Sequence, residues 1–184
     1  MYLFEPGDDT TVCVLKAVKP KKVKLFTGPP SHKEDDAKVV HELMNNADIR
    51  IVSGGTTSQI VARELGVEVK SSTEIYDKEV PPIAYIQGVD LVTEGVLTLS
   101  KTIDRLKSLS KSLDSDIFKA KDGASQMAKL LYSASHIKLL VGRSLNIANA
   151  ESSFQRDLEL RLHVIGELEK ILVKLGKIVT VEYY

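Results

Sequence analysis

The 184-residue sequence contains one cysteine, few aromatic residues and no tryptophan. The single cysteine, Cys13, cannot form an internal disulfide, and the alternating apolar stretch around it is typical of a packed strand. Lys plus Arg and Asp plus Glu both number 25, so no net charge favours a nucleic-acid partner. No apolar run approaches the length that spans a bilayer, so no membrane contact is expected.

The first residues also lack the pattern of a secretory leader. Residues 1–6 have neither a basic segment nor a long apolar core. With this start and one cysteine, we expect a cytoplasmic protein. The hydrophobic content of 43 % and the chain length suit one well-buried domain.

The most informative stretch runs from Ile49 to Gly66 and predicts one strand-turn-helix unit. Two glycines end the strand and three hydroxyl residues open the helix: Gly54, Gly55, Thr56, Thr57 and Ser58. Glycine lets a ligand approach the backbone, and the N–H groups at a helix start carry partial positive charge, so an oxyanion fits there. Hydroxyl residues are also ordinary helix caps, and capping alone is the alternative role of this turn.

Similar units recur along the chain. The apolar pattern predicts strands over 11–18, 23–26, 83–86, 89–92, 137–141 and 177–184, and helices over 34–46, 96–109, 157–175 and from Asp122 onward. Successive strand-helix units imply an α/β fold: a mostly parallel sheet with helices on both faces, in three Rossmann-like layers, preceded by a stray N-terminal strand. A basic linker at Lys19–Lys22 divides residues 1–18 from an α/β domain over 19–184.

In an open parallel sheet, ligands collect at the carboxyl ends of the strands, where the turns into the helices meet. Besides residues 54–58, these turns carry Glu94, Arg143 and Asn146. We expect Arg143 to pair with a phosphate or carboxylate and the backbone of 54–58 to donate hydrogen bonds to it. The alternative role of Glu94 is to complement the dipole of the helix that follows it, and the alternative for Arg143 is that it is only a surface cation. No pair of residues in these turns forms a nucleophile and its base.

Two sets of motifs resemble one family of enzymes. The stretch from Gly7 to Leu15, GDDTTVCVL, resembles the closing segment of metal-dependent (PPM-type) serine/threonine protein phosphatases, where an Asp-Asp/Asn-x-Thr motif leads into a final apolar strand. The motifs over 53–57, 88–95 and 179–184 are similar to the region that follows the catalytic domain in some bacterial members of the sporulation stage II protein E branch.

The resemblance implies that residues 1–18 are the terminal strand segment of a phosphatase catalytic domain and that 19–184 follow it. It also implies that Asp8 holds Mn²⁺ or Mg²⁺ in the intact parent enzyme, whose metal centre activates a water. The family's other metal aspartates lie upstream in the catalytic domain and have no counterpart in this sequence. We therefore expect neither a cofactor nor phosphatase activity from this chain alone.

Three functions are open for the α/β domain. The first is a regulatory module that senses a small anionic ligand and contacts its own catalytic domain, in a parent enzyme whose substrate is a phosphoprotein. The second is a stand-alone enzyme that acts on a small phosphorylated or carboxylated metabolite with Glu94 as acid or base. The third is a homodimer formed through the helix 157–175, whose apolar stripe otherwise belongs to the core. We favour the first.

Overall fold

The computed structural model describes residues 11–15, 17–111, 116–144 and 151–184, with the backbone alone for 151–157. In chain order the strands and helices are β1 (Lys22–Thr27), a 3₁₀ turn (Lys33–Asp35), α1 (Asp36–Met44), β2 (Ile49–Ser53), α2 (Gly55–Leu65), β3 (Lys70–Ser71), β4 (Ala84–Tyr85), β5 (Leu91–Thr93), α3 (Val96–Leu109), a second 3₁₀ turn (Asp116–Phe118), α4 (Gly123–Ser133), β6 (His136–Val141), α5 (Glu151–Lys174) and β7 (Ile178–Tyr183). Strands thus alternate with helices along most of the chain, as the apolar pattern predicts.

Within the described residues the strands form one sheet of seven, in the order β3-β4-β5-β2-β1-β6-β7. From β5 to β7 this order is parallel, whereas β3 and β4 are antiparallel at one edge. β1 is central, since Leu25 lies between Ile51 of β2 and Leu139 of β6. Parallel neighbours need crossover connections, and here these are helices. The α/β class expected from the sequence is confirmed.

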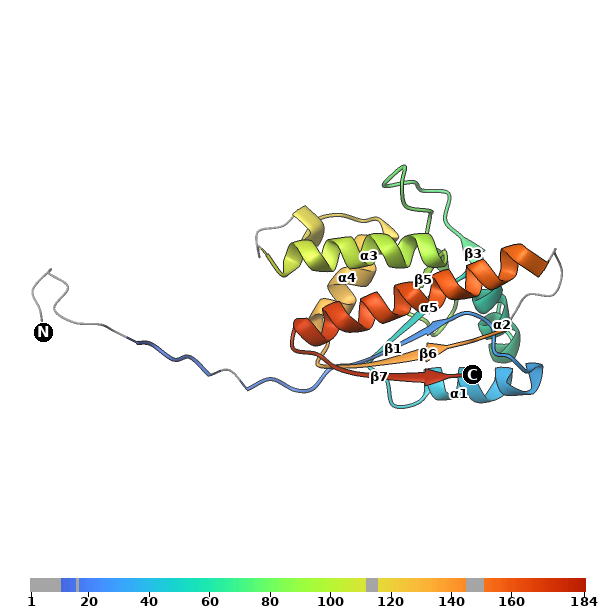
Figure 1. The fold of residues 1–184 in the computed structure, drawn as a ribbon, viewed down its shortest axis with the longest axis horizontal. Helices are drawn as coiled ribbons and strands as arrows, with labels where there is room; N and C mark the ends of the chain where they lie inside the picture. The colour runs from blue at the N-terminus through green and yellow to red at the C-terminus, as the bar shows by residue number, and fades with distance from the viewer. Residues whose placement is uncertain (1–10, 16, 112–115, 145–150) are drawn as a thin grey trace, which may run out of the picture.

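Helices cover both faces of the sheet and make three layers (Figure 1). α1 and α2 pack on one face, and α3, α4 and α5 pack on the other. Side chains alternate along a strand, so Leu25 faces the three-helix side and Phe26 faces the two-helix side, and both are fully buried. Each such side chain contributes about 2 kcal/mol through burial, so two adjacent apolar residues are favoured in this central strand.

Most helix ends follow the residue types in the sequence. α3 has the predicted limits, the Asp122 carboxylate caps α4 by accepting from the Ser125 N–H over 2.9 Å, and Gly176 after α5 has a φ of +76°. The predicted start of the last helix is wrong, because α5 begins at Glu151 rather than at Asp157. Its first six residues, Glu-Ser-Ser-Phe-Gln-Arg, include one apolar residue, so the periodic pattern does not reveal them.

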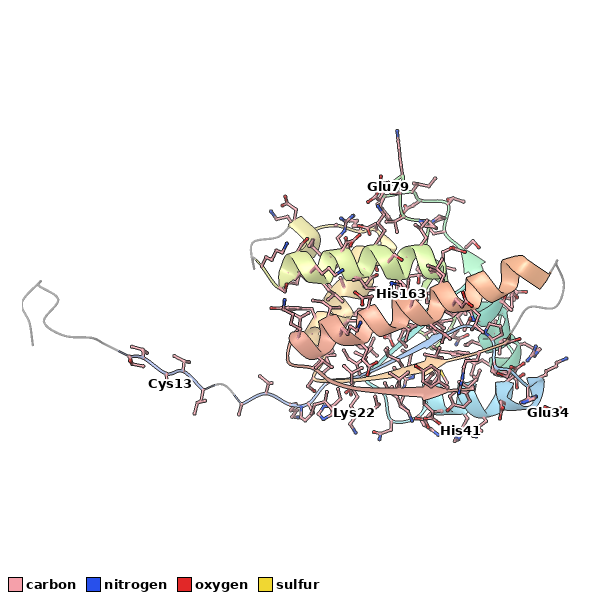
Figure 2. All side chains as sticks on the ribbon, in the orientation of Figure 1. Cys13, Lys22, Glu34, His41, Glu79 and His163 are labelled. Atoms are coloured by element: carbon pink, nitrogen blue, oxygen red, sulfur yellow. The ribbon has the colours of Figure 1, made fainter. Side chains whose placement is uncertain are left out.

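The N-terminal segment lies apart from the α/β body, and Figure 2 shows Cys13 on it, away from the sheet. Residues 11–15 and 17–20 are exposed, including the apolar side chains of Val12, Val14, Leu15 and Val18. The strand predicted over 11–18 pairs with no other strand in the described part of the chain, where nothing accepts or donates its ladder hydrogen bonds. The division of the chain into 1–18 and 19–184 stays a prediction.

A chain of charges crosses the α1 side of the sheet. The Glu42 carboxylate accepts from Lys24 Nζ over 2.7 Å and from Lys138 Nζ over 2.8 Å, and Lys138 also pairs with Glu182 at 2.6 Å. Tyr184 donates its hydroxyl proton to Glu182, and burial together with this bond raises the pKa of Tyr184. Because Lys24 is only 7 % exposed, its carboxylate partner compensates for the desolvation of the ammonium group.

α3 and α4 each bury a hydroxyl group, those of Thr98 and Ser125, for which the described residues provide no hydrogen-bond partner. We expect Thr98→Val, which replaces the hydroxyl by a methyl group, to raise the free energy of unfolding by about 1 kcal/mol. Thr102→Val is the control and should destabilise, because the Thr102 hydroxyl donates to the Thr98 carbonyl over 2.8 Å. Urea unfolding measures both, and a loss of stability in Thr98→Val would mean that its hydroxyl is satisfied.

Candidate functional site

In two pairs of neighbouring strands, the helices that follow the two strands lie on opposite faces of the sheet. α2 follows β2 on one face while α3 follows the adjacent β5 on the other, and α1 and α5 diverge in the same way after β1 and β6. Such divergence opens a crevice at the carboxyl ends of the strands, where open α/β sheets bind their ligands. The topology therefore provides two places for a site.

Backbone fills the first crevice, between β1 and β6. The Gly142 N–H donates to Thr27 O over 2.9 Å, and the Ser144 N–H donates to Pro29 O over 3.0 Å. A Cβ atom on Gly142 would collide with the carbonyl oxygens of Gly28 and Pro29, so the two turns are in direct backbone contact. A ligand has no space between them.

The second crevice, between β2 and β5, holds a pocket of about 150 Å³. Its walls come from the turns after β1, β2 and β5 and from one side chain of α5. The described residues that line it are Thr27, Gly28, Pro29, Ser53, Gly54, Gly55, Thr56, Thr57, Gly95, Val96 and Arg161. Drug-sized ligands occupy pockets of roughly 300 Å³ or more, so this one suits a single small group such as a phosphate or a carboxylate.

The N-termini of α2 and α3 meet at this pocket. Their cap residues are Gly54 and Gly95, and neither helix has a side-chain cap hydrogen bond. The first intrahelical bonds run from Ser58 N–H to Gly54 O and from Leu99 N–H to Gly95 O, so the N–H groups that precede them have no acceptor within the helices. Two helix N-termini together act as about one positive elementary charge, which favours an anion.

Thr57 joins the pocket to the end of β1. Its hydroxyl accepts from the Gly28 N–H over 2.9 Å, and the residue is 1 % exposed. No described acceptor takes the proton of this hydroxyl, so Thr57 can donate it into the pocket. Gly28 has a φ of +79° and Gly54 a φ of +119°, conformations that favour glycine. The residue types of these turns thus fix the backbone that surrounds the pocket.

Arg161 of α5 supplies the charged side chain of the pocket. Its Nη1 donates to the Gly142 carbonyl oxygen over 3.2 Å, and a Cβ atom on Gly28 would collide with it. A guanidinium is always charged and matches the geometry of carboxylates and phosphates. The sequence prediction missed Arg161, and its only signal is a cation one helical turn before the buried Ile165.

The structure brings four of the predicted residues together at the pocket: Gly54, Gly55, Thr56 and Thr57. Ser58 is not among the described residues that line the pocket, and its hydroxyl donates to the Gly54 carbonyl over 2.8 Å. Glu94 is exposed, and its carboxylate accepts from the Gly95 N–H over 3.0 Å, so it touches the start of α3 without lining the pocket.

The other predicted residues lie elsewhere or outside the described part. Arg143 stacks on Tyr183, with its Cζ 4.6 Å from the ring centroid, and it is not among the described residues of the pocket wall. Asn146 and Asp8 lie outside the described residues, so their roles stay predictions.

The described residues do not form a metal centre. Among them, no group of three or more His, Cys, Asp or Glu side chains could hold an ion, so the Mn²⁺ or Mg²⁺ implied by the phosphatase resemblance has no ligand set there. No helix in this part of the chain is both long and apolar enough to cross a bilayer. Comparison of the chain with models of protein families, with curated proteins and with solved structures finds no match.

Proposed function

We propose that residues 19–184 form a regulatory, ligand-sensing α/β domain that binds a small anionic ligand in the pocket between α2 and α3. One observation carries this proposal: two helix N-termini without side-chain caps converge on a pocket that Arg161 also lines. Donors without acceptors are costly unless water or a ligand satisfies them. A phosphate or carboxylate satisfies several of them at once.

The described lining of the pocket suits binding better than catalysis. It contains no carboxylate, histidine, cysteine or lysine side chain, so no general acid or base lies beside a bound anion. Glu94, the acid or base of the enzymatic alternative, is exposed and bonded to the start of α3. Turnover of a phosphorylated metabolite that Glu94→Gln abolished would favour that alternative instead.

The apolar stripe of α5 is used within the chain. Ile165, Leu168 and Leu172 are buried in the core cluster that α3 and α4 also line. This burial leaves the stripe unavailable for pairing with a second copy, and so favours the sensing function over the homodimer.

The parent protein in this proposal is a bacterial metal-dependent serine/threonine protein phosphatase of the sporulation stage II protein E branch, and its substrate is a phosphoprotein. The motifs at 7–15 and 53–57 support this assignment. The exposed apolar segment before Pro20 also supports it, because such a segment suits a strand of a preceding domain. The α/β domain would then pass its ligand state to that catalytic domain, which would hold the metal ions.

Thermal unfolding of the 184-residue chain against orthophosphate, sulfate, nucleotides and phosphosugars tests ligand sensing. An anion at about ten times its Kd should stabilise the fold by about 1.4 kcal/mol. We expect Arg161→Met, which removes the guanidinium but keeps an apolar stem, to abolish this shift. Arg143→Met is the matched control and should retain it, because Arg143 stacks on Tyr183 outside the pocket.

Two outcomes would contradict the proposal. If none of the anions shifts the unfolding midpoint, the uncapped N-termini serve the fold alone and the domain senses no such ligand. If Arg143→Met abolishes the shift while Arg161→Met retains it, an anion binds near the end of β6 rather than in the pocket between α2 and α3.

A further inference from the structure

A second concave surface lies at the opposite ends of α3 and α5 from the pocket. The two helices run side by side (Figure 1), and their carboxyl-terminal ends border a groove of about 320 Å³. Its charged residues are Lys107, Lys111, Lys170, Lys174 and Glu167. Four lysines against one glutamate give the groove a formal charge of +3, although the whole chain is formally neutral.

Three of these lysines form no close ion pair within the described residues, although Lys107 lies near enough to Glu167 to help lower the pKa of that carboxyl. Lys170 Nζ lies 3.0 Å from the Glu167 carboxylate, and this contact lowers the pKa of Glu167. Lys107, Lys111 and Lys174 have no described carboxylate at ion-pair distance. One carboxylate thus faces both Lys170 and Lys107, and the groove keeps an excess of ammonium groups over carboxylates.

Neutralisation of helix dipoles explains only part of this charge. Lysines favour helix C-termini, where each end acts as about half a negative elementary charge. Two adjacent ends therefore call for about one positive charge, and the groove exceeds this by roughly two. Asp104, on the preceding turn of α3, does not line the groove. The surplus is thus available to a partner.

We propose that this groove binds an acidic peptide segment of a partner protein. Ile171 lines the groove together with the lysines but is only 6 % exposed, so charge is the main feature that the groove offers a partner. A concave site fits a peptide better than the flat surface of a bilayer. The formal charge of the whole chain is zero, so a general attraction to the nucleic-acid backbone is not expected. Lysines act as mobile point charges, which suits carboxylates at variable positions along a peptide.

Fluorescence anisotropy with a labelled peptide of about six glutamates tests the groove, since such a peptide carries the complementary charge. We expect saturable binding that weakens as salt is raised, because the contacts are exposed. Lys107→Glu combined with Lys174→Glu should weaken binding about tenfold or more, because like charges then face the peptide. Lys33→Glu combined with Lys78→Glu is the matched control: both lysines are exposed elsewhere, and the net charge changes equally.

Three results would overturn the proposal. The first is an absence of peptide binding even at low salt. The second is equal weakening in both double variants, which would mean that only overall charge matters. The third is binding to phosphatidylserine vesicles, lost in the groove variant, without binding to the peptide.

The groove does not depend on the anion pocket, so phosphate-induced stabilisation should persist in the double variant with Lys107→Glu and Lys174→Glu.

Discussion

Replacement of Gly142 by alanine should destabilise the fold by roughly 3 kcal/mol. The new Cβ atom would collide with the carbonyl oxygens of Gly28 and Pro29. These are backbone atoms, and they cannot retreat easily because Ser144 N–H bonds to Pro29 O and Gly142 N–H bonds to Thr27 O. The substitution therefore forces apart the ends of the adjacent strands β1 and β6.

Gly166→Ala is the matched control for this prediction. Gly166 lies within α5, and a Cβ atom there would have no neighbour within 4 Å among the described residues. Alanine is favoured over glycine inside a helix, so this variant should gain up to about 1 kcal/mol. Urea unfolding of both variants gives the comparison. A Gly142→Ala protein as stable as the wild type would mean that the turns after β1 and β6 are not in backbone contact.

The second large effect is expected from Glu42→Gln, at about 2 kcal/mol of lost stability. The change removes the negative charge shared by Lys24 and Lys138, and it leaves the buried Lys24 ammonium without a carboxylate. The cost stays below the roughly 3 to 5 kcal/mol of a fully buried pair, because the Glu42 side chain is 32 % exposed. Glu167→Gln is the control and should change little, since its partner Lys170 is largely exposed.

The Glu42 ion pairs also predict how stability depends on pH. Hydrogen bonds from Lys138 and Lys24 lower the pKa of Glu42 from its ordinary value of 4.5. A carboxyl group whose pKa is lowered by folding contributes fully above its ordinary pKa, and the contribution is lost as the pH falls through the lowered value. The difference in stability between wild type and Glu42→Gln should therefore be constant near neutral pH and shrink below pH 4.5. A difference that grows on acidification would contradict this origin.

The parallel strands and their helices are predictable because local signals agree with the final structure. β2 is a short β-branched run that ends at glycines, α3 has a clear apolar period, and Asp122 stands where α4 needs a cap. The antiparallel edge is not predictable in the same way. β4 lies within the strand predicted over 83–86, but β3 has only two residues, too few for a periodic pattern. The antiparallel direction of the two strands depends on the path of the loop between them.

The residues of the candidate site also differ in whether local sequence predicts them. The place of Gly54 to Thr57 at the site could be predicted, because the glycines and the start of the helix are adjacent in the sequence. Arg161 could not, because only the packing of α5 across the ends of β1 and β6 brings its guanidinium to the pocket. Arg143 follows a strand directly, which made it the more obvious cation, but stacking on Tyr183 holds it elsewhere.

The central place of β1 has a consequence for how the protein is made. The N–H of Lys22, the first residue of β1, donates to the side chain of Asp48, 26 positions later. The N–H of the preceding residue, Lys21, donates to the side chain of Ser135, 114 positions later. Ribosomes add about 5 to 20 residues per second, so β1 waits on the order of ten seconds for β6. During that time one edge of β1 has no neighbour, and the strand edge beside Leu25 and Phe26 can pair with another chain. We therefore expect the nascent chain to be most prone to aggregation before Val141 has left the ribosome.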